Sequence, residues 1–252
     1  MIFRIIVMNN SNSKIYIVED FYENPDKIRY TALQQGLYNH GYQPGMRTLP
    51  CFNEEAHNKI VKTLGSFIYP SGDCYSFQFN TKNDVSWIHT DTVPSELIKH
   101  DDRSVWAAVV YLTPDANVNT GTTLYSDKKY NVRNMKNIIF NNSHSRSKSE
   151  QIIDELSTYG SDVTKWHSET KIGNKYNRLL IYDASYYHQS NGYFGDSKEN
   201  CRLIQVFFFC TKKNDNTYKP AIKYRINEFI NHENLPTISN SPGFLNKLKA
   251  ND

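Results

Sequence analysis

The chain has 252 residues and a formal net charge of +3, which fits one large domain, alone or with a modest extension, and argues against the dense basic stripe of a nucleic-acid binder. Hydrophobic residues make up 38% and aromatic residues 13%, so the chain can bury a real core, and this aromatic content favours strands. No segment approaches the roughly 18 to 20 apolar residues that cross a bilayer, and the start lacks a signal-peptide pattern.

The first third of the chain is predicted to contain one strand and two helices. Residues 14–19 alternate between apolar and polar side chains, as a strand does. Asn24-Pro25-Asp26 is a typical helix start, because proline fits the first helical turn, and Gly36 would end that helix. Residues 54–68 place apolar side chains at helical spacing and predict a second, amphipathic helix.

From Cys74 onward the pattern changes to short apolar or alternating runs separated by polar turns, which is typical of an antiparallel sandwich or barrel. The runs are CYSFQF, SWIHTD, VWAAVVYL, GTTLYS, NRLLIYD and RLIQVFFF. Residues 141–175 interrupt them with a polar loop and a predicted helix, SEQIIDELSTYG. We therefore expect one domain over 1–212, with its β core from about residue 74, and a C-terminal extension over 213–252 with a helix at 222–230.

The cysteines form neither a CxxC pair nor a metal-finger spacing. They are Cys51, Cys74, Cys201 and Cys210. This usage predicts reduced thiols and a cytoplasmic protein.

SWIHTD carries a candidate pair of metal ligands. If this run is a strand, His89 and Asp91 point to the same face, because side chains alternate along a strand. A third ligand is offered by His188, at the end of the apolar run NRLLIYD and its continuation. Two histidines and one carboxylate leave positions open, as in non-haem Fe(II) oxygenases, whereas a structural zinc site would be closed by four ligands. A His-x-Asp pair alone more often marks a turn or a surface pair than a pair of metal ligands.

Arg202 stands at the head of the apolar run RLIQVFFF, fourteen residues after His188. An inward arginine there would need an anionic partner, and its guanidinium fork suits the distal carboxylate of a dicarboxylic acid. An arginine at the strand end that faces water fits the position equally well.

At this point the sequence resembles the Fe(II)/2-oxoglutarate-dependent oxygenase superfamily, in particular its prolyl-hydroxylase-like branch and uncharacterised phage and bacterial relatives. The resemblance covers roughly residues 15–210 and implies a mainly β fold with flanking helices, a double-stranded β-helix (jelly roll). The matching segments, in order, are IVEDFYENPDKIRYTAL, YQPGMR, WIHTD, WAAVVYLTPD, NTGTTLY, NRLLIYDASYYHQS and CRLIQVFFF.

The resemblance assigns a role to each candidate site residue. It places Fe(II) on the catalytic triad His89, Asp91 and His188. It pairs Arg202 with the C5 carboxylate of the co-substrate 2-oxoglutarate, has Tyr111 share that carboxylate, and lets Ser190 face the same pocket; core packing would also explain Tyr111. O₂ and 2-oxoglutarate would give succinate and CO₂, with hydroxylation as the default outcome and ascorbate as a supporting reductant.

The sequence departs from the family pattern at two places near the pocket. Thr120-Gly121 stands where a Gly-Gly pair is common, and Thr113 stands where an asparagine is usual. These departures concern substrate contacts rather than the metal ligands.

The expected substrate is a peptidyl residue or a small molecule, with no membrane partner and no nucleic acid. The loop 38–50, with Arg47, and the insertion 141–175, with Trp166, are candidate lids, although plain surface loops fit as well. The alternative function is a cupin-type, metal-binding jelly roll without oxygenase turnover, in a phage accessory or binding role. A phage-encoded enzyme would act in the host cytoplasm. The sequence predicts no oligomeric state.

Overall fold

The computed structural model describes residues 5–10, 13–39, 41, 43–92, 103–142 and 145–212. The chain divides into two compact units, Met1–Asn216 and Thr217–Asp252, and all the described residues belong to the first. The expected C-terminal extension, with its predicted helix at 222–230, lies outside the described residues.

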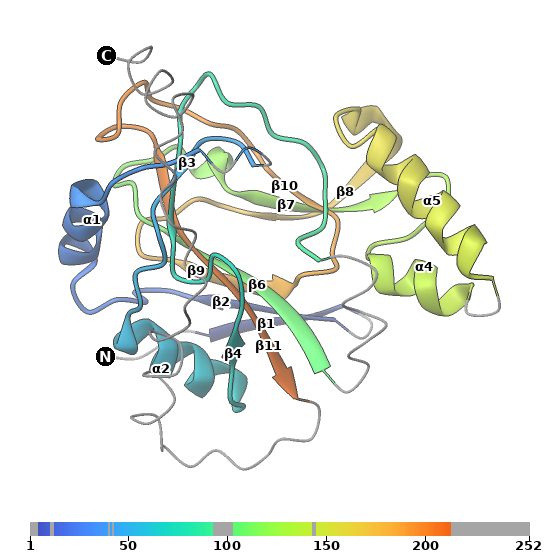
Figure 1. Ribbon diagram of the computed structural model, residues 1–252, viewed down its shortest axis with the longest axis horizontal. Helices are drawn as coiled ribbons and strands as arrows, with labels where there is room; N and C mark the ends of the chain where they lie inside the picture. The colour runs from blue at the N-terminus through green and yellow to red at the C-terminus, as the bar shows by residue number, and fades with distance from the viewer. Residues whose placement is uncertain are drawn as a thin grey trace, which may run out of the picture. The chain divides into compact units, whose positions relative to one another are not determined.

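Over the described residues the fold is mainly β, with two antiparallel sheets and flanking helices (Figure 1). The larger sheet has the order β1-β2-β9-β6-β11-β5-β3, with β4 also paired to β11. Its strands are β1 (Ile5–Asn10), β2 (Ser13–Val18), β3 (Met46–Arg47), β4 (Tyr69–Pro70), β5 (Phe77–Asn80), β6 (Arg103–Tyr111), β9 (Leu179–Asp183) and β11 (Arg202–Lys212). The smaller sheet has the order β10-β7-β8, formed by β7 (Thr122–Asp127), β8 (Trp166–Ile172) and β10 (His188–Ser190).

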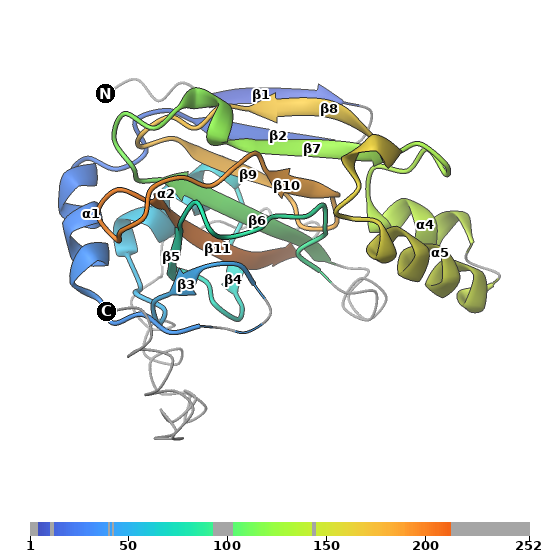
Figure 2. The ribbon, with the colours of Figure 1, turned by 90° about the horizontal axis from the view of Figure 1, so that it is seen from above.

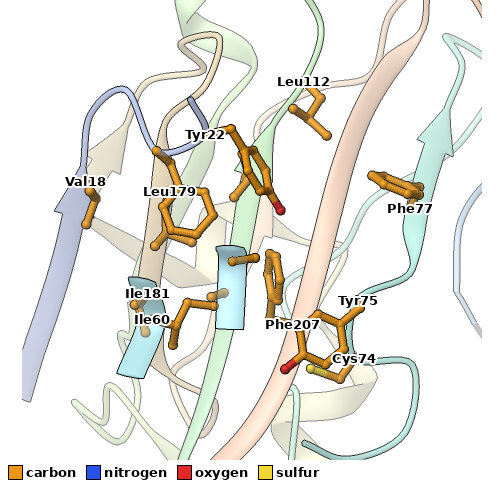
Figure 3. Packing of buried hydrophobic residues seen from close by; sticks show 14 of the residues in the cluster. Val18, Tyr22, Ile60, Cys74, Tyr75, Phe77, Leu112, Leu179, Ile181 and Phe207 are labelled. Carbon is orange, nitrogen blue, oxygen red and sulfur yellow. The ribbon is translucent and has the colours of Figure 1, made fainter. Parts of the chain in front are cut away.

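Two helices, α1 (Pro25–Gln34) and α2 (Glu54–Leu64), pack against one face of the larger sheet. Each begins at an asparagine whose side chain accepts a bond from a backbone N–H of the first turn, the usual way to satisfy that donor. The core beneath them joins Ile60 of α2 to Phe207 of β11 and Ile181 of β9 (Figure 3). The prediction of two helices here is confirmed, but α2 stops four residues early because Gly65 adopts a left-handed conformation.

The opposite face of the larger sheet meets the smaller sheet. A second cluster combines Ile17, Ala107 and Leu180 of the larger sheet with Leu124 of β7 and Ile172 of β8. Because side chains alternate along each strand, one face of the larger sheet serves the helices and the other serves the second sheet. The candidate site lies on this second face.

A helical insertion joins β7 to β8 (Figure 2). We call residues 128–165 the α4–α5 lobe, after its helices α4 (Met135–Asn141) and α5 (Arg146–Thr158). Two single-turn 3₁₀ helices complete this region: Val118–Thr120 precedes β7, and Val163–Lys165 ends the lobe. The prediction of a helix at SEQIIDELSTYG is confirmed by α5. The strand β8 lies within the segment 141–175 that is predicted as an interruption, whereas α4 precedes that segment and shares only Asn141 with it.

The predicted strand at SWIHTD is wrong in its extent. Only an isolated bridge joins His89 to His188, because the flanking N–H groups bond elsewhere, Ile88 to Gly160 and Asp91 to Ala184. Among the residues that the structure describes, no helix has the length and apolarity of a membrane span.

Candidate metal centre

The structure brings the three predicted ligands together. One ligand atom from each of His89, Asp91 and His188 lies within 4.8 Å of the others. His188 Nε2 is 3.2 Å from Asp91 Oδ2, and His89 Nε2 is 3.7 Å from Asp91 Oδ1. These residues come from β10 and from the segment that the isolated bridge holds against it. Three converging donors that leave other positions open are the set that non-haem iron uses.

Both imidazoles are oriented by backbone carbonyl groups. His89 Nδ1 lies 2.9 Å from the carbonyl oxygen of Trp87, and His188 Nδ1 lies 3.0 Å from that of Tyr186. A carbonyl oxygen can only accept, so each Nδ1 carries a proton, and each Nε2, on the side of Asp91, is the atom left to bind a metal. This is the arrangement in which metal-binding histidines are held by a second hydrogen bond.

Asp91 is held ionised. Burial raises the pKa of this carboxyl group, but His188, His89 and the hydroxyl of Tyr182 outweigh burial and lower the pKa well below its usual range. The Tyr182 hydroxyl donates to Asp91 Oδ2 at 3.0 Å. A buried carboxylate whose charge is compensated by neutral donors and imidazoles is a ready ligand for a divalent cation.

The two histidines are shifted in opposite directions. Desolvation within the site and the neighbouring imidazole of His188 lower the pKa of His89. Burial also acts to lower the pKa of His188, but Asp91 outweighs it and raises that pKa. A divalent metal would compete with a proton for the Nε2 atoms of both histidines, since metal ligation requires neutral imidazole.

A cavity of about 640 Å³ is lined by the triad and by two of the residues predicted to bind a co-substrate. It is lined by His89, Asp91, His188 and, from β11 and β10, Arg202 and Ser190. A volume of this size is typical of small-molecule sites, which hold roughly 300 to 1,000 Å³.

Arg202 is buried rather than facing water. Its side chain is 1% exposed, its Nε donates to the carbonyl oxygen of Thr120 at 3.3 Å, and its guanidinium carbon lies 5.6 Å from the ring centre of Tyr111 and 5.8 Å from that of Tyr193. Among the described residues no carboxylate pairs with it, and Nη1 has no hydrogen-bond partner. A buried guanidinium with an unused donor is costly unless a ligand supplies an acceptor.

Tyr111 and Ser190 occupy different places around Arg202. Tyr111 is fully buried and its hydroxyl lies 2.8 Å from Thr122 Oγ1, so Tyr111 supports the wall, while Thr122 itself lines the cavity. Burial raises the pKa of Tyr111. Ser190 lines the cavity beside β7, opposite Thr122 in the strand register. Their roles toward a co-substrate stay predictions.

Of the two candidate lids, only one has its named residue in the cavity wall. Arg47, of β3, lines the cavity, where its Nη1 bonds Asp73 at 2.7 Å and its Nη2 bonds Gln78 at 3.1 Å. Trp166 is buried in the core of the α4–α5 lobe and does not line the cavity. The loop 38–50 therefore contributes a cavity wall, and Trp166 does not.

Sequence reasoning missed Tyr182, Tyr193 and Thr122. Tyr182 lies in the apolar run NRLLIYD, where an aromatic residue is expected to belong to the hydrophobic core. Its contact with Asp91 joins residues 91 positions apart in the sequence, so no local pattern indicates it. Thr122 and Tyr193 lie beside expected site residues, and only their proximity in sequence could have suggested them.

Residues 2–192 match the model of DUF6445, a family of unknown function, and the chain belongs to this family. None of the curated proteins matches the sequence.

Several solved structures are similar to this chain. HygX from Streptomyces hygroscopicus with nickel and 2-oxoglutarate bound has a TM-score of 0.48 and 10% identity, over 79% of this chain and 83% of that one. A Trichoplax adhaerens prolyl hydroxylase in complex with a hypoxia inducible factor peptide has a TM-score of 0.41 and 10% identity, over 80% and 85%. A Pseudomonas putida prolyl-4-hydroxylase has a TM-score of 0.36 and 13% identity, over 81% and 95%.

One fold can carry many functions, so what this chain binds follows from the geometry of its own site.

We expect Tyr182→Phe to weaken divalent metal binding about tenfold, because it removes the hydrogen bond that orients Asp91, and loss of such outer partners costs 10- to 100-fold. Co(II) titration of the metal-free protein measures the change. Tyr16→Phe is the matched control, since Tyr16 lies in the core on the helix-covered face of the same sheet. Equal Co(II) affinities for Tyr182→Phe and wild type would remove Tyr182 from the metal site.

Proposed function

We propose that the chain is a non-haem Fe(II)- and 2-oxoglutarate-dependent dioxygenase that hydroxylates a peptidyl residue or a small molecule. One observation carries the proposal: a single cavity is lined both by the converging ligands His89, Asp91 and His188 and by Arg202. The buried guanidinium of Arg202 has no carboxylate partner among the described residues. We further propose that the two facing antiparallel sheets form a double-stranded β-helix, or jelly roll.

The residues fit an iron ion bound by three protein ligands. The two Nε2 lone pairs and the ionised Asp91 carboxylate supply two neutral donors and one negative charge, with no thiol among them. This donor set suits Fe(II) better than a structural zinc site, which favours four ligands that often include cysteine. All four cysteines are free, and none lines the cavity.

The residues also fit a dicarboxylate co-substrate. Arg202 would hold its distal carboxylate, with Thr122 and Ser190 offering hydroxyl groups along the same wall. Tyr111 and Tyr193 lie against the guanidinium and limit its orientations. When bound, Fe(II) with 2-oxoglutarate and O₂ supplies the oxidising chemistry, with succinate and CO₂ as by-products.

The protein's own work is to orient, to desolvate and to leave room for a substrate. The carbonyls of Trp87 and Tyr186 fix the imidazoles, and Tyr182 fixes the carboxylate. Apolar side chains on β6 and β11 form part of the cavity lining and offer water no hydrogen-bonding partner there. These chain features are needed for oxygenation, in which a reactive site must be shielded from water.

A cupin-type metal protein without turnover would share the triad but would leave Arg202 without a ligand. The two functions differ in whether 2-oxoglutarate is consumed.

We expect the Fe(II)-loaded protein to release succinate from 2-oxoglutarate in the presence of O₂ and ascorbate, even slowly without its substrate. Succinate measured by mass spectrometry tests this, alongside a screen of peptide and metabolite pools for an added oxygen atom. His89→Ala should abolish the release, because it removes one of three ligands. His167→Ala, an exposed histidine on β8, should not. If 2-oxoglutarate neither binds the metal-loaded protein nor yields succinate, the oxygenase proposal is wrong.

A further inference from the structure

The α4–α5 lobe has a hydrophobic core of its own, separate from the cores on the two faces of the large sheet. Figures 1 and 2 show α4 and α5 beside the ends of β7 and β8, away from α1. Most members of this core come from the lobe and its flanking strands, but Ile88 and Tyr187 do not. They are the residues immediately before the two histidines of the triad.

Backbone geometry makes this adjacency informative. His89 and His188 exchange two backbone hydrogen bonds, of 3.0 and 2.9 Å, so they form a directly opposed antiparallel pair. Side chains of such a pair lie on the same face, here with ring centres 4.5 Å apart, and the residues before them point to the other face. The histidine side chains therefore line the cavity, whereas the side chains of Ile88 and Tyr187 pack into the core of the lobe, where these residues are 2% and 5% exposed.

The lobe also grips the backbone of both segments. The N–H of Ile88 donates to the carbonyl of Gly160 at 2.8 Å, two residues after α5, and the N–H of Tyr187 donates to the carbonyl of Arg133 at 3.0 Å, two residues before α4. These two bonds come from the two ends of the lobe's helical hairpin. The lobe thus contacts each ligand segment through both a buried side chain and backbone hydrogen bonding.

Gly160 is the closest point of this contact. A Cβ atom built on it would lie 2.4 Å from the carbonyl oxygen of Ile88, a distance that real Cβ atoms do not show. The obstacle is backbone, which cannot swing aside as a side chain could. Any larger residue at this position must push α5 and the His89 segment apart.

A lid over the substrate is the other role that such an insertion could have. The cavity wall, however, takes no residue from 128–165 among those that the structure describes. The lobe contacts the two ligand segments on the side away from the cavity, through Ile88 and Tyr187, which precede His89 and His188 in the sequence.

We propose that the α4–α5 lobe is a positioning element for the metal centre, and that Gly160 is the positioning residue that sets the place of His89 relative to His188. The inference rests on the proposed function in that the triad must bind a metal. A rigid support of this kind matters because ligands must be held to within about 0.5 Å of their productive geometry.

The test is Gly160→Ala, compared with Gly36→Ala, where an added Cβ meets no atom within 4 Å. Metal-free proteins are titrated with Co(II), whose visible absorption reports ligand geometry. We expect Gly160→Ala to bind Co(II) at least about tenfold more weakly, as for loss of outer-shell support, and with an altered spectrum. Gly36→Ala should match wild type in both affinity and spectrum.

The outcomes separate the two levels of proposal. If wild type binds no Co(II), the metal site itself is refuted, and the positioning role with it. If wild type and Gly160→Ala bind Co(II) equally with one spectrum, only the positioning role is refuted, even when the melting temperature of the variant falls. If Gly160→Ala does not fold, Ile88→Ala replaces it, because this change removes the side chain that anchors the His89 segment in the lobe, and the same two readouts decide.

Discussion

Asp91→Asn is expected to weaken divalent metal binding by about 100-fold or more, because it removes the single negative charge among the three ligands. The metal-free protein should keep its fold. An asparagine has the same shape, and with its amide nitrogen in the place of Oδ2 it can donate one hydrogen to His188 Nε2 and the other to the Tyr182 hydroxyl oxygen, so the change in the free energy of unfolding should stay within about 1 kcal/mol.

Thermal unfolding with and without Co(II) measures both quantities. At a metal concentration 100 times the wild-type dissociation constant, binding stabilises wild type by about 2.7 kcal/mol. A variant with 100-fold weaker affinity would gain only about 0.4 kcal/mol under the same conditions. Asp154→Asn, on the exposed side of α5, is the matched control and should gain as much as wild type. Full stabilisation of Asp91→Asn by Co(II) would show that another ligand set holds the metal.

Much of the candidate site could be predicted from the sequence because its residues sit at strand ends in segments with strong local patterns. The separation of His89 from Asp91 and the apolar run before His188 placed three donors where sheet strands meet, and the structure brings them together. The burial of Arg202, which the sequence left open against a solvent-facing alternative, follows from its register opposite Asn80 on an inner strand.

What the sequence could not predict depends on contacts between distant segments. Tyr182 reaches Asp91 across 91 residues, and Gly160 reaches Ile88 across 72, so neither has a local signal. The prediction of a full strand at SWIHTD was wrong for the same reason. Its backbone groups bond to Gly160 and Ala184 as well as to His188, and an alternating pattern cannot show that three different partners share one short segment.

Arg202→Met is expected to weaken 2-oxoglutarate binding by about 30-fold to several thousandfold, since removing one partner of a buried ion pair costs about 2 to 5 kcal/mol. Metal affinity should be unchanged, because Arg202 is not among the ligand atoms that converge. The 2-oxoglutarate affinity of Arg202→Lys should lie between those of wild type and Arg202→Met, because lysine keeps the positive charge but loses the two-pronged guanidinium. Calorimetric titration with 2-oxoglutarate in the absence of O₂, with Mn(II) in the site, measures these affinities. Arg146→Met, whose side chain is 83% exposed on α5, is the control.

Stability gives this variant a second, independent readout. In the ligand-free protein the guanidinium of Arg202 has no described acidic partner and an unused Nη1 donor, so methionine should cost little stability or even add some. A residue kept for packing alone would behave oppositely, losing stability on substitution without a selective loss of co-substrate binding. A stable Arg202→Met variant that binds metal but not 2-oxoglutarate therefore indicates a ligand-binding role. Loss of both metal and fold would assign Arg202 to the core, and unchanged 2-oxoglutarate affinity would exclude it from the co-substrate site.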